Sequence, residues 1–371
     1  MARDAGGRRP PAHHHPGRRR VRRALTGSRL IERIAKGPRP PRLSLVVIAR
    51  DEAPQLQRLL SHHRPLWDEA VVVDTGSRDE SPIVAAAAGA RVTAIAWGDD
   101  FAAARNAALG RARGDWALVL DCDEWIAPDE FDAVRACLTA PAGWVFEQRN
   151  YCRDADGAHA VPVAPGTPWA PDGATAYRPN LTCRLFPLGL GIRYEGLVHE
   201  VPDAAVARAG LALRPCDVAI HHEGHLVQGE RLQVKNARYT RLLRLKVARR
   251  PRDPKARHEL AVQLVAEGHP DLARRLLERT VREFPAHLEG QPARLLLAAI
   301  LVQGGEVDAG LAQVDAAVRT WPALRTGWVA AVRLHRQAGR PAEAAGYLAE
   351  ARRLFPADPE LAALAGAAAA G

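Results

Sequence analysis

The sequence predicts an α/β domain built on a mostly parallel sheet, followed by an all-α domain of helix–turn–helix repeats. Two patterns favour this architecture. From residue 43 onward, short apolar and β-branched runs alternate with stretches of helical periodicity, which is typical of parallel strands covered by helices. In the last third of the chain, a glycine and a proline recur at a nearly constant spacing, which is typical of stacked helix pairs.

The expected strands and helices of the first domain follow one another along the chain. Strands are expected at 44–48, 70–73, 91–95 and 116–120, and helices at 51–62, 81–88 and 101–109. Residues 151–179 hold five prolines and three glycines and are expected to form one long loop. Strand-like runs resume at 181–186, 191–194 and 217–220.

Three glycines in the last third of the chain are each followed by a proline seventeen positions later. The pairs are Gly268 with Pro285, Gly305 with Pro322 and Gly339 with Pro356, and successive prolines are 37 and 34 residues apart. Small residues recur at matching points, namely Ala273, Gly310 and Ala344, then Thr280, Ala317 and Ala351. This is the register of a tetratricopeptide-like repeat of about 34 residues, in which the glycine breaks the turn and the small residues let the helices approach. Trp328 takes the leading aromatic position of such a repeat.

These patterns divide the chain into four parts. We expect a basic disordered tail at 1–42, an α/β domain at 43–226, a helical linker at 227–254 and tetratricopeptide-like repeats at 255–371. The tail holds thirteen Lys and Arg residues against Asp4 and Glu32, so it accounts for the whole net charge of +10. No specific nucleic-acid partner is therefore expected for the folded part. For the tail, an inert extension is the favoured interpretation, and contact with an anionic membrane surface or nucleic acid is the alternative.

Several classes of protein are disfavoured by what the sequence lacks. No apolar run approaches the roughly 18 residues that span a bilayer, and the Arg-rich start lacks the apolar segment of a signal peptide. The five cysteines show no paired spacing, which indicates neither a disulfide framework nor a zinc site. We therefore expect a reduced, cytoplasmic protein, with a peripheral place at the inner face of the membrane as the alternative. Neither G-x-G-x-x-G nor a Walker sequence is present, which argues against dehydrogenases and P-loop enzymes.

Acidic residues recur where the expected strands end. Asp121 and Asp123 follow the fourth strand, and Asp51-Glu52, Asp74 and Asp99-Asp100 follow the three earlier ones. Because the carboxyl ends of parallel strands lie along one edge of a sheet, these groups could line one crevice. Carboxylates there suit a divalent cation that carries a substrate's phosphates. The alternative is a set of solvated turns and helix starts, where Asp is also favoured.

Four short motifs stand in order over the α/β domain. They are LVVIARDE at 45–52, VDTGSRD at 73–79, WGDDFAAARN at 97–106 and LDCDEW at 120–125. In this order and spacing they resemble family 2 glycosyltransferases of the GT-A fold. The closest likeness is to the subgroup with C-terminal tetratricopeptide repeats, similar to bacterial cell-surface core and peptide glycosyltransferases. The resemblance implies a GT-A nucleotide-sugar-binding, Rossmann-like domain, and the repeats extend it to nearly the full length after the tail.

The resemblance also implies a nucleotide-sugar donor, usually a uridine diphosphate sugar, bound with Mg²⁺ or Mn²⁺. The donor-binding residues that it implies are Asp51, Glu52, Asp74, Asn106 and Asp121. Glu52 and Asp74 would contact the base and the ribose, and Asn106 would lie near the diphosphate or the sugar. Asp121 and Asp123 would handle the metal and the ribose.

The first motif departs from the family pattern at two positions. The family more often has Lys where Arg50 stands and Asn where Asp51 stands. An extra carboxylate at position 51 would alter the contacts to the base. Of the five donor-binding residues, Asp51 therefore has the role that the resemblance defines least.

Two later segments resemble the family as well. RYEGLVHE at 193–200 resembles the segment that closes the acceptor side, and IHHEGH at 220–225 resembles the terminal histidine segment. In GT-A enzymes a late histidine often completes the metal shell. His222 fits that pattern best, with His221 as the alternative, so Asp123 and His222 are the expected metal ligands. A surface cluster of histidines is the competing interpretation.

Inversion at the anomeric carbon requires a base that accepts a proton from the acceptor. Glu200 is the first candidate and Glu195 the second. Either could instead be a structural carboxylate paired with Arg184 or Arg193.

The function expected from these features is a metal-dependent, inverting glycosyltransferase that uses a nucleoside diphosphate sugar. The acceptor could be a glycan, a lipid-linked core or a peptide, and the repeats would bind a protein partner or the acceptor. The main alternative is a repeat-based interaction module with an inactive glycosyltransferase domain. A third hypothesis, a nucleotidyltransferase, would normally require a glycine-rich phosphate loop, and residues 49–54 do not provide one.

Overall fold

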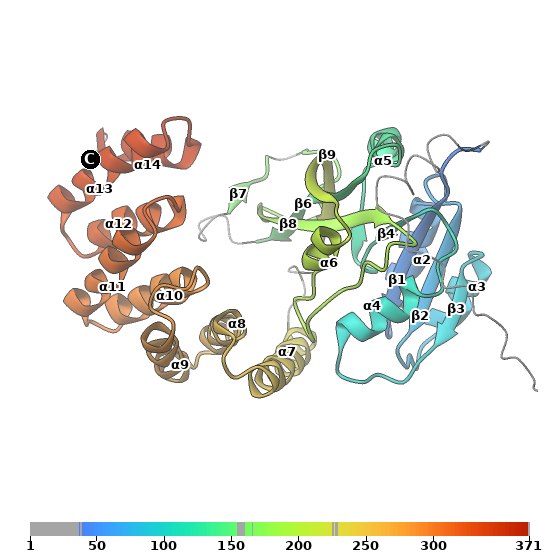
Figure 1. The fold of residues 1–371 in the computed structure, drawn as a ribbon, viewed down its shortest axis with the longest axis horizontal. Coiled ribbons are helices and arrows are strands. Elements are labelled where there is room, and N and C mark those ends of the chain that lie inside the picture. The colour runs from blue at the N-terminus through green and yellow to red at the C-terminus, as the bar shows by residue number, and fades with distance from the viewer. Residues whose placement is uncertain are drawn as a thin grey trace, which may run out of the picture.

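The structure, a computed structural model, describes residues 37, 39–153, 160–164, 166–224, 226 and 229–369. Nearly all of the tail predicted to be disordered lies outside the described residues. The described residues form a sheet-based α/β part and then a run of helices from α7 to α14 (Figure 1). The predicted fold class, α/β followed by all-α repeats, is confirmed.

The first half of the sheet is parallel, as predicted. It contains β1 (Leu43–Ala49), β2 (Glu69–Asp74), β3 (Arg91–Ala94) and β4 (Trp116–Val119), in the order β3-β2-β1-β4. All four residues of β4 are buried, and β1 is buried along almost its whole length. Continuous burial means that both faces of the sheet are covered, which explains the unbroken apolar runs in the sequence.

Three helices connect these strands, namely α2 (Ala53–His62), α3 (Ser81–Ala87) and α4 (Phe101–Leu109). α2 buries Leu56, Leu59 and Leu60, whose spacing of three and four residues places them on one face. α4 begins after Asp100, whose carboxylate accepts a hydrogen bond from the Ala103 N–H (2.8 Å). Such a cap satisfies a donor that the first helical turn leaves without a partner.

The second half of the sheet contains longer strands than the sequence predicts. β6 (Ala142–Cys152) and β8 (Ala176–Pro187) pair antiparallel up to Cys152 opposite Ala176, so the predicted loop at 151–179 is wrong at both ends. Pro179 lies in β8 opposite Arg149 of β6, and among the described residues no second strand pairs with β8 at this position, since β4 pairs from Leu185 onward and β7 pairs at Ala176 and Tyr177. Proline is tolerated in a strand where no ladder hydrogen bond is required of its nitrogen.

The rest of this half completes the sheet in the order β4-β8-β6-β9-β5. It includes β5 (Glu124–Trp125), β7 (Val161–Pro162) and β9 (Ala212–His222), with the helices α5 (Phe131–Cys137) and α6 (Asp203–Arg208) and the short 3₁₀ turn η1 (Pro128–Glu130). The predicted strand at 217–220 lies inside β9. The predicted strand at 191–194 is wrong, because Gly191 has a φ of 74° that interrupts extended backbone.

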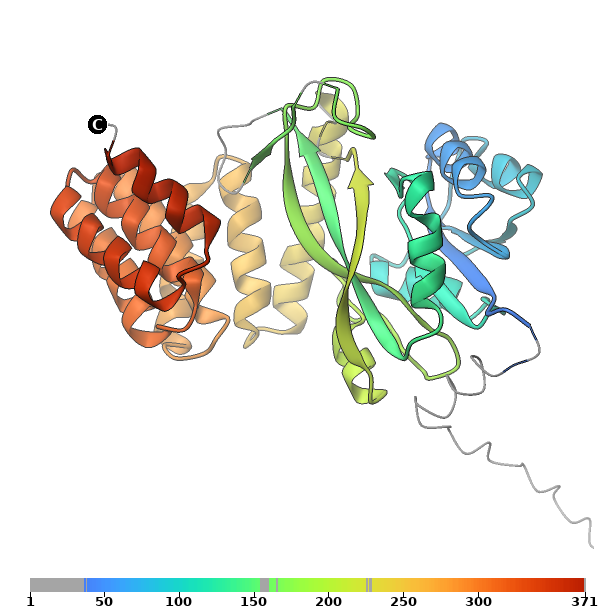
Figure 2. The same ribbon diagram turned by 90° about the horizontal axis from the view of Figure 1, so that it is seen from above.

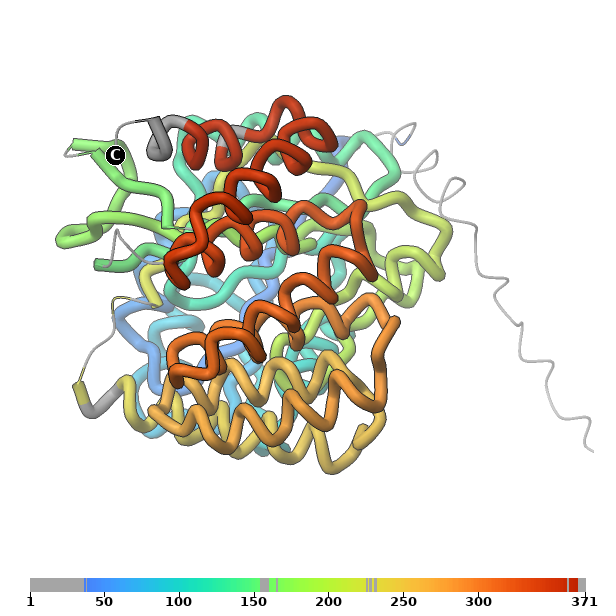
Figure 3. Tube along the Cα trace, turned by 90° about the vertical axis from the view of Figure 1, so that its left-hand side faces the viewer, coloured from blue at the N-terminus to red at the C-terminus, as the bar shows by residue number. Residues whose placement is uncertain are grey.

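The C-terminal part consists of helices throughout. They are α7 (Glu230–Arg249), α8 (Pro254–Ala266), α9 (Pro270–Glu283), α10 (Gly290–Gln303), α11 (Val307–Thr320), α12 (Arg325–Gln337), α13 (Pro341–Leu354) and α14 (Pro359–Ala369). From α8 onward they stack as successive pairs (Figure 3). The recurring glycines lie in the turn of each pair with φ of 80°, 87° and 69°, and each recurring proline follows the second helix. The tetratricopeptide-like register is confirmed.

The helices form an arc that starts beside the sheet at α7 and brings α14 back to the level of β7 (Figure 1). Seen from above, α7 and α8 lie between the sheet and the later helices (Figure 2). Val198, from the loop before α6, is buried in one apolar cluster with Leu242 of α7, Leu260 of α8 and Leu277 of α9. The first helices of the C-terminal part therefore share a core with a loop of the α/β part.

Gly310→Ala is expected to lower the free energy of unfolding of the repeats by about 1–3 kcal/mol, because it overpacks the contact between α10 and α11. A Cβ at Gly310 would lie 2.6 Å from the side chain of Val302 and 2.8 Å from the carbonyl oxygen of Ala298. Gly346 of α13 is the matched control, since among the described residues nothing beyond its own helix backbone and chain neighbours lies within 4 Å of its Cβ position. Gly346→Ala should stabilise the helix by up to about 1 kcal/mol. Urea unfolding followed by far-UV circular dichroism measures both, and equal responses would contradict the packing argument.

Candidate functional site

A cleft lies at the carboxyl ends of β1, β2 and β4. It is lined by Ile48, Ala49, Arg50, Glu52, Thr75, Trp97, Phe101, Asp121, Cys122, Asp123 and Arg238. Three of the carboxylates predicted at strand ends, those of Glu52, Asp121 and Asp123, therefore meet in one place. This is the position at which open α/β sheets bind ligands.

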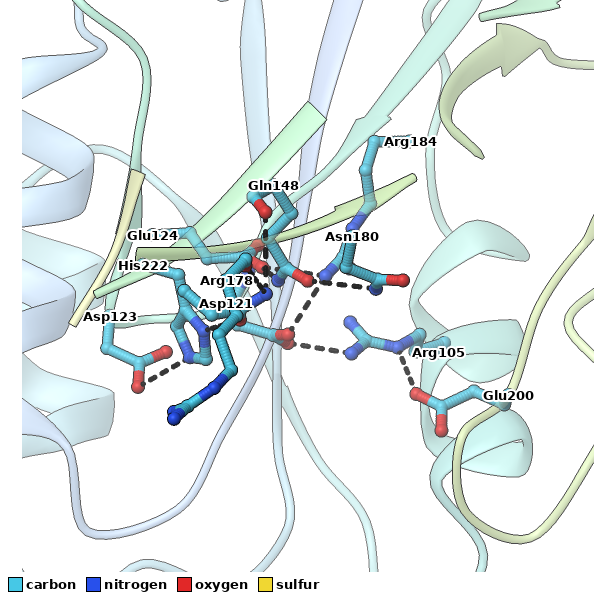
Figure 4. Close-up of polar contacts among 11 residues, drawn as sticks. Arg105, Asp121, Asp123, Glu124, Gln148, Arg178, Asn180, Arg184, Glu200 and His222 are labelled. Atoms are coloured by element: carbon cyan, nitrogen blue, oxygen red, sulfur yellow. Dashed lines mark hydrogen bonds and ion pairs between the residues drawn. The ribbon is translucent and has the colours of Figure 1, made fainter. Parts of the chain in front are cut away.

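Asp121 lies between two buried arginines (Figure 4). Nη2 of Arg105 donates to Oδ1 of Asp121 at 2.7 Å, and Nη2 of Arg184 donates to Oδ2 at 3.3 Å. Burial alone would raise the pKa of Asp121, but the two guanidinium groups hold that pKa well below its ordinary value. Asp121 is thus an ionised carboxylate whose orientation is fixed by α4 and β8.

Glu124, a fully buried carboxylate, supports Asp121 from behind. Its Oε2 accepts a hydrogen bond from the backbone N–H of Asp121 at 2.8 Å, and its Oε1 accepts one from Nη2 of Arg184 at 2.7 Å. The side-chain amide of Gln148 donates to the same Oε1. Burial raises the pKa of Glu124, in contrast to the lowered pKa of Asp121. The network holds the Asp121–Asp123 turn against β6 and β8.

Asp123 faces His222 at the end of β9 (Figure 4). Oδ2 of Asp123 and Nε2 of His222 are 3.2 Å apart, and Nδ1 of His222 is 2.7 Å from Oδ1 of Asn150 on β6. Burial would lower the pKa of His222, but the hydrogen bond to Asp123 raises it. With Asn150 as the acceptor for Nδ1–H, His222 presents Nε2 to the carboxylate of Asp123.

Asp123 and His222 fit one side of a Mg²⁺ or Mn²⁺ site. A carboxylate oxygen and an imidazole nitrogen are suitable ligands, and Mg²⁺ is usually bound by one or two carboxylates plus substrate phosphates and water. A Cβ at Gly224 would lie 2.4 Å from Nε2 of His222 and 2.6 Å from Oδ2 of Asp123, so only glycine leaves that space open. Among the described residues no cluster of three or more His, Cys, Asp or Glu is placed to hold a metal. A metal held by this pair would need further ligands, which substrate phosphates or water supply in Mg²⁺ sites.

His221, the alternative metal ligand, has other neighbours. Its Nδ1 is 2.8 Å from the hydroxyl of Tyr151, and its ring stacks on Trp125 with centroids 5.5 Å apart. Burial lowers its pKa to about 4. The geometry therefore favours His222 over His221 as the histidine that faces Asp123, while His225 of the same segment lies outside the described residues.

The remaining predicted donor-binding residues are bound to nearby backbone. The carboxylate of Asp74 accepts hydrogen bonds from the N–H groups of Gly76 (3.1 Å) and Ser77 (3.2 Å). Oδ1 of Asp51, which has a φ of 55°, accepts one from the Arg78 N–H at 2.6 Å. The side chain of Asn106 donates to the carbonyl oxygen of Tyr194 and accepts from its N–H, both at 2.9 Å. These three side chains shape the loops beside the cleft, and their direct contact with a donor stays a prediction.

Glu200 joins the charge network of Asp121 through a shared arginine. Its Oε1 accepts a hydrogen bond from Nε of Arg105 at 2.6 Å, and the side chain of Glu200 is 7% exposed. Arg105 thus connects Glu200 directly with the acidic turn (Figure 4). Of the two candidate bases, Glu200 is the one that the structure connects with the cleft.

Glu195 lies apart from this network. Its side chain is 44% exposed and pairs with Arg208 of α6. The arginine partners considered from the sequence are also different from those found, because Arg184 binds Asp121 and Glu124, and Nη1 of Arg193 donates to the carbonyl oxygen of Asn106 (3.3 Å).

A comparison with known families matches residues 44–157 to the glycosyl transferase family 2 model. Residues 44–157 form a family 2 glycosyltransferase domain. The match covers the strands and helices that carry Glu52, Asp74 and the Asp121–Asp123 turn. His222 and Glu200 lie beyond it, in the part of the chain that completes the site.

Relatives of the chain match it over very different lengths. A TPR repeat-containing protein of Synechococcus elongatus is 31% identical over 297 residues, which are 75% of this chain and 66% of that protein. The succinoglycan biosynthesis protein ExoO of Rhizobium meliloti is 38% identical over 95 residues, 24% of this chain and 27% of that protein. The chain thus spans two thirds or less of the length of these relatives. Among solved structures, a TPR protein of Thermus thermophilus is 24% identical, with a TM-score of 0.32, over 37% of this chain and 76% of that chain.

No helix in the part of the chain that the structure describes has the length and hydropathy needed to cross a membrane. None of the five cysteines, all of which the structure describes, forms a disulfide, and the sulfur atoms of Cys137 and Cys216 are 3.6 Å apart.

Sequence reasoning missed several residues of the glycosyltransferase site. Arg105, Glu124 and Arg184 form the charge network, and Gly224 gives the space beside His222. Arg105 and Glu124 stand inside motifs that the sequence already singled out, so a search for charge partners within those motifs could have found them. Arg184 was considered only as a partner of Glu200 or Glu195, because its actual partners, Asp121 and Glu124, are distant in sequence.

Buried His63 supports the same region from α2 and predicts a pH dependence of stability. Its Nδ1 is 2.8 Å from the carbonyl oxygen of Leu59, and its Nε2 accepts a hydrogen bond from the Ile126 N–H at 3.1 Å. Both nitrogens are used by the neutral ring, and burial lowers the pKa of His63 to about 4 from 6.5.

Between about pH 4 and 6.5 the unfolded chain therefore binds a proton at His63 that the folded chain does not bind, so stability falls as the pH falls through this window. Through His63, the free energy of unfolding is expected to fall by about 2 kcal/mol between pH 8 and pH 5. Urea unfolding of wild type and His63→Gln at both pH values should show the difference between them shrinking by that amount. Parallel pH profiles would contradict the assignment.

Proposed function

We propose that this domain transfers a sugar from a nucleoside diphosphate sugar, with a uridine diphosphate sugar as the first candidate, to a glycan, lipid-linked or peptide acceptor. One arrangement supports the proposal above all others. Asp121, Asp123 and His222 converge at the carboxyl ends of parallel strands in a family 2 domain, beside a glycine that leaves space for a ligand. This is where a metal-bound diphosphate fits.

Each group in the cleft has a proposed part in donor binding. Glu52 would accept hydrogen bonds from the base or the ribose, and Asp121 would orient the ribose. Asp123 and His222 would hold Mg²⁺ or Mn²⁺, which when bound neutralises charge on the leaving diphosphate. Asp74, Asp51 and Asn106 would shape the donor pocket through the loops that they fix.

Glu200 is the proposed base. For inversion at the anomeric carbon, the acceptor oxygen attacks from the face opposite the diphosphate and gives up a proton. Glu200 is supported in this role by its link to Asp121 through Arg105, which fixes its carboxylate relative to the donor side of the site.

The repeats would bind a protein partner or present the acceptor, because stacked helix pairs of this kind form extended concave surfaces. Their first helices share a core with the loop that carries Glu200, through Val198. A partner or acceptor bound to the repeats would therefore contact helices that pack directly against the loop of Glu200. A cytoplasmic location, with the acceptor reached from the inner face of the membrane, is part of the same proposal.

Product analysis tests the proposed function. Purified protein is incubated with Mn²⁺, a panel of nucleotide sugars and candidate acceptors, and the nucleotide products are separated by chromatography. Metal-dependent release of a nucleoside diphosphate supports glycosyl transfer, whereas release of pyrophosphate would indicate a nucleotidyltransferase. No turnover of any donor, together with an unchanged phenotype of an Asp123→Ala strain, would favour the interaction module with an inactive domain.

A further inference from the structure

Helix α7 contributes a cation to the cleft from outside the matched family segment. Arg238 of α7 lines the cleft together with Asp121 and Asp123, although α7 begins at Glu230, far beyond residue 157. Its guanidinium carbon lies 5.8 Å from the centre of the Phe101 ring. A cation over an aromatic face is attracted by the ring, so Phe101 helps to fix the direction of the Arg238 side chain.

Among the described residues no carboxylate forms an ion pair with Arg238, unlike Arg105 and Arg184. Arg105 and Arg184 are committed to Asp121, Glu124 and Glu200. Among the described residues, no hydrogen-bond acceptor reaches Nε of Arg238, although this atom is buried. A buried N–H without an acceptor costs free energy, and a guanidinium group can satisfy it with a bidentate phosphate.

A second cation on the same face of α7 points to the same ligand. Lys235 precedes Arg238 by one helical turn, and residues three apart are neighbours on a helix surface. Nζ of Lys235 donates to the carbonyl oxygen of Gly224 at 3.2 Å. Gly224 is the residue that lies against Asp123 and His222. The two cations therefore flank the position at which the metal pair would meet the diphosphate.

We propose that Arg238, with Lys235 beside it, binds the diphosphate of the donor and stabilises it as the leaving group. This inference rests on the proposed function. As the bond between the anomeric carbon and the diphosphate oxygen breaks, its electron pair stays on the diphosphate, which gains one negative charge. The acceptor oxygen forms the new bond to the anomeric carbon and loses its proton to the base. Arg238 stays protonated throughout and acts by charge, so it is a leaving-group residue supplied by the helix that leads into the repeats.

The experiment compares nucleoside diphosphates with their monophosphates. Calorimetric titrations with Mn²⁺ use UDP, GDP, dTDP and CDP on the full chain, and the tightest of them is then compared with its monophosphate. Arg238→Gln should weaken diphosphate binding about 10- to 100-fold, which is the value of a lost charge-assisted hydrogen bond. Binding of the monophosphate should fall by at most about 3-fold. Arg238→Lys keeps the charge and should lie between wild type and Arg238→Gln.

Arg244, an exposed arginine further along α7 and outside the cleft, gives the matched control, and Arg244→Gln should bind as wild type does. If Arg238→Gln does not fold, Arg238→Lys is tested instead, by comparing its loss of diphosphate affinity with its loss of monophosphate affinity. Equal losses for the diphosphate and the monophosphate would show a structural role and overturn the inference, as would wild-type affinity in the variant. If wild type binds none of the four diphosphates, the donor class itself is wrong, and that failure is distinct from a failure of Arg238 alone.

Discussion

Glu200→Gln is expected to lower the rate of sugar transfer about 10³-fold while donor binding and folding stay close to wild type. Glutamine cannot accept the acceptor's proton, which accounts for the loss. Its amide oxygen can still accept the hydrogen bond that Nε of Arg105 now donates to Glu200 at 2.6 Å, which preserves the link to Asp121. Initial rates at saturating donor, with donor affinity measured separately by calorimetry, give the two readouts.

Glu195→Gln is the control for this substitution. Glu195 is a half-exposed carboxylate paired with Arg208 at the surface, so its replacement should leave the transfer rate nearly unchanged. The role of Glu200 would be disproved by full transfer in Glu200→Gln. A loss confined to Glu195→Gln would move the base to the second candidate.

Asp123→Asn is expected to weaken metal-dependent donor binding by about 100-fold or more. Loss of a residue that only hydrogen-bonds to a metal ligand already lowers metal affinity about 10- to 100-fold, and Asp123 is a proposed ligand itself. The amide is a poorer ligand than the carboxylate and carries no charge to attract a divalent cation. It retains the shape of Asp123 and a hydrogen-bonding group for Nε2 of His222. Calorimetric titration of the donor at several Mn²⁺ concentrations measures the change.

Asp132→Asn provides a comparison for Asp123→Asn, because Asp132 is an exposed carboxylate on α5 away from the cleft. It should bind the donor with wild-type affinity and the same dependence on Mn²⁺. If Asp123→Asn also kept that dependence, the metal would have to lie elsewhere than between Asp123 and His222.

Much of the α/β part could be predicted because its determinants are local. The buried runs of β1, β2 and β4 are continuous in the sequence, and Asp121 and Asp123 follow β4 directly. The parallel sheet then brings the ends of these strands together without further information. In the same way, the glycines at 268, 305 and 339 are required by positive φ angles, so their spacing alone reveals the repeats.

The charge network could not be predicted because its contacts are distant in sequence. Arg105 and Glu200 are 95 residues apart, and Arg184 and Glu124 are 60 residues apart. Arg184 meets Glu124 because β8 returns antiparallel beside β4, and the sequence predicted only the second half of β8, at 181–186, as a strand-like run. Prolines are also tolerated in a strand where the backbone nitrogen need not pair, and among the described residues Pro179 is paired with β6 alone.

The placement of α7 beside the cleft was equally hidden from the sequence. The α7 sequence has an apolar face and a polar face, as most surface helices do. This pattern does not indicate which part of the chain its apolar face packs against. The loop that carries Glu200 is attached to α7 and α8 by two contacts of Val198. Its side chain is buried with Leu242 and Leu260, and its carbonyl oxygen accepts a hydrogen bond from Nζ of Lys246 at 3.0 Å. This packing places α7, which lies in the linker predicted at 227–254, beside the cleft, where Arg238 is one of the lining residues.

The central claim is that Asp121, Asp123 and His222 form a metal-dependent site for a nucleotide sugar. The most direct measurement is a calorimetric titration of wild-type protein with a panel of nucleotide sugars, in Mn²⁺, then in excess EDTA, then after Mn²⁺ is restored. We predict that at least one nucleotide sugar binds in Mn²⁺, that EDTA abolishes the binding, and that restored Mn²⁺ recovers it. Binding that EDTA leaves unchanged, or no binding of any nucleotide sugar in Mn²⁺, would contradict the claim.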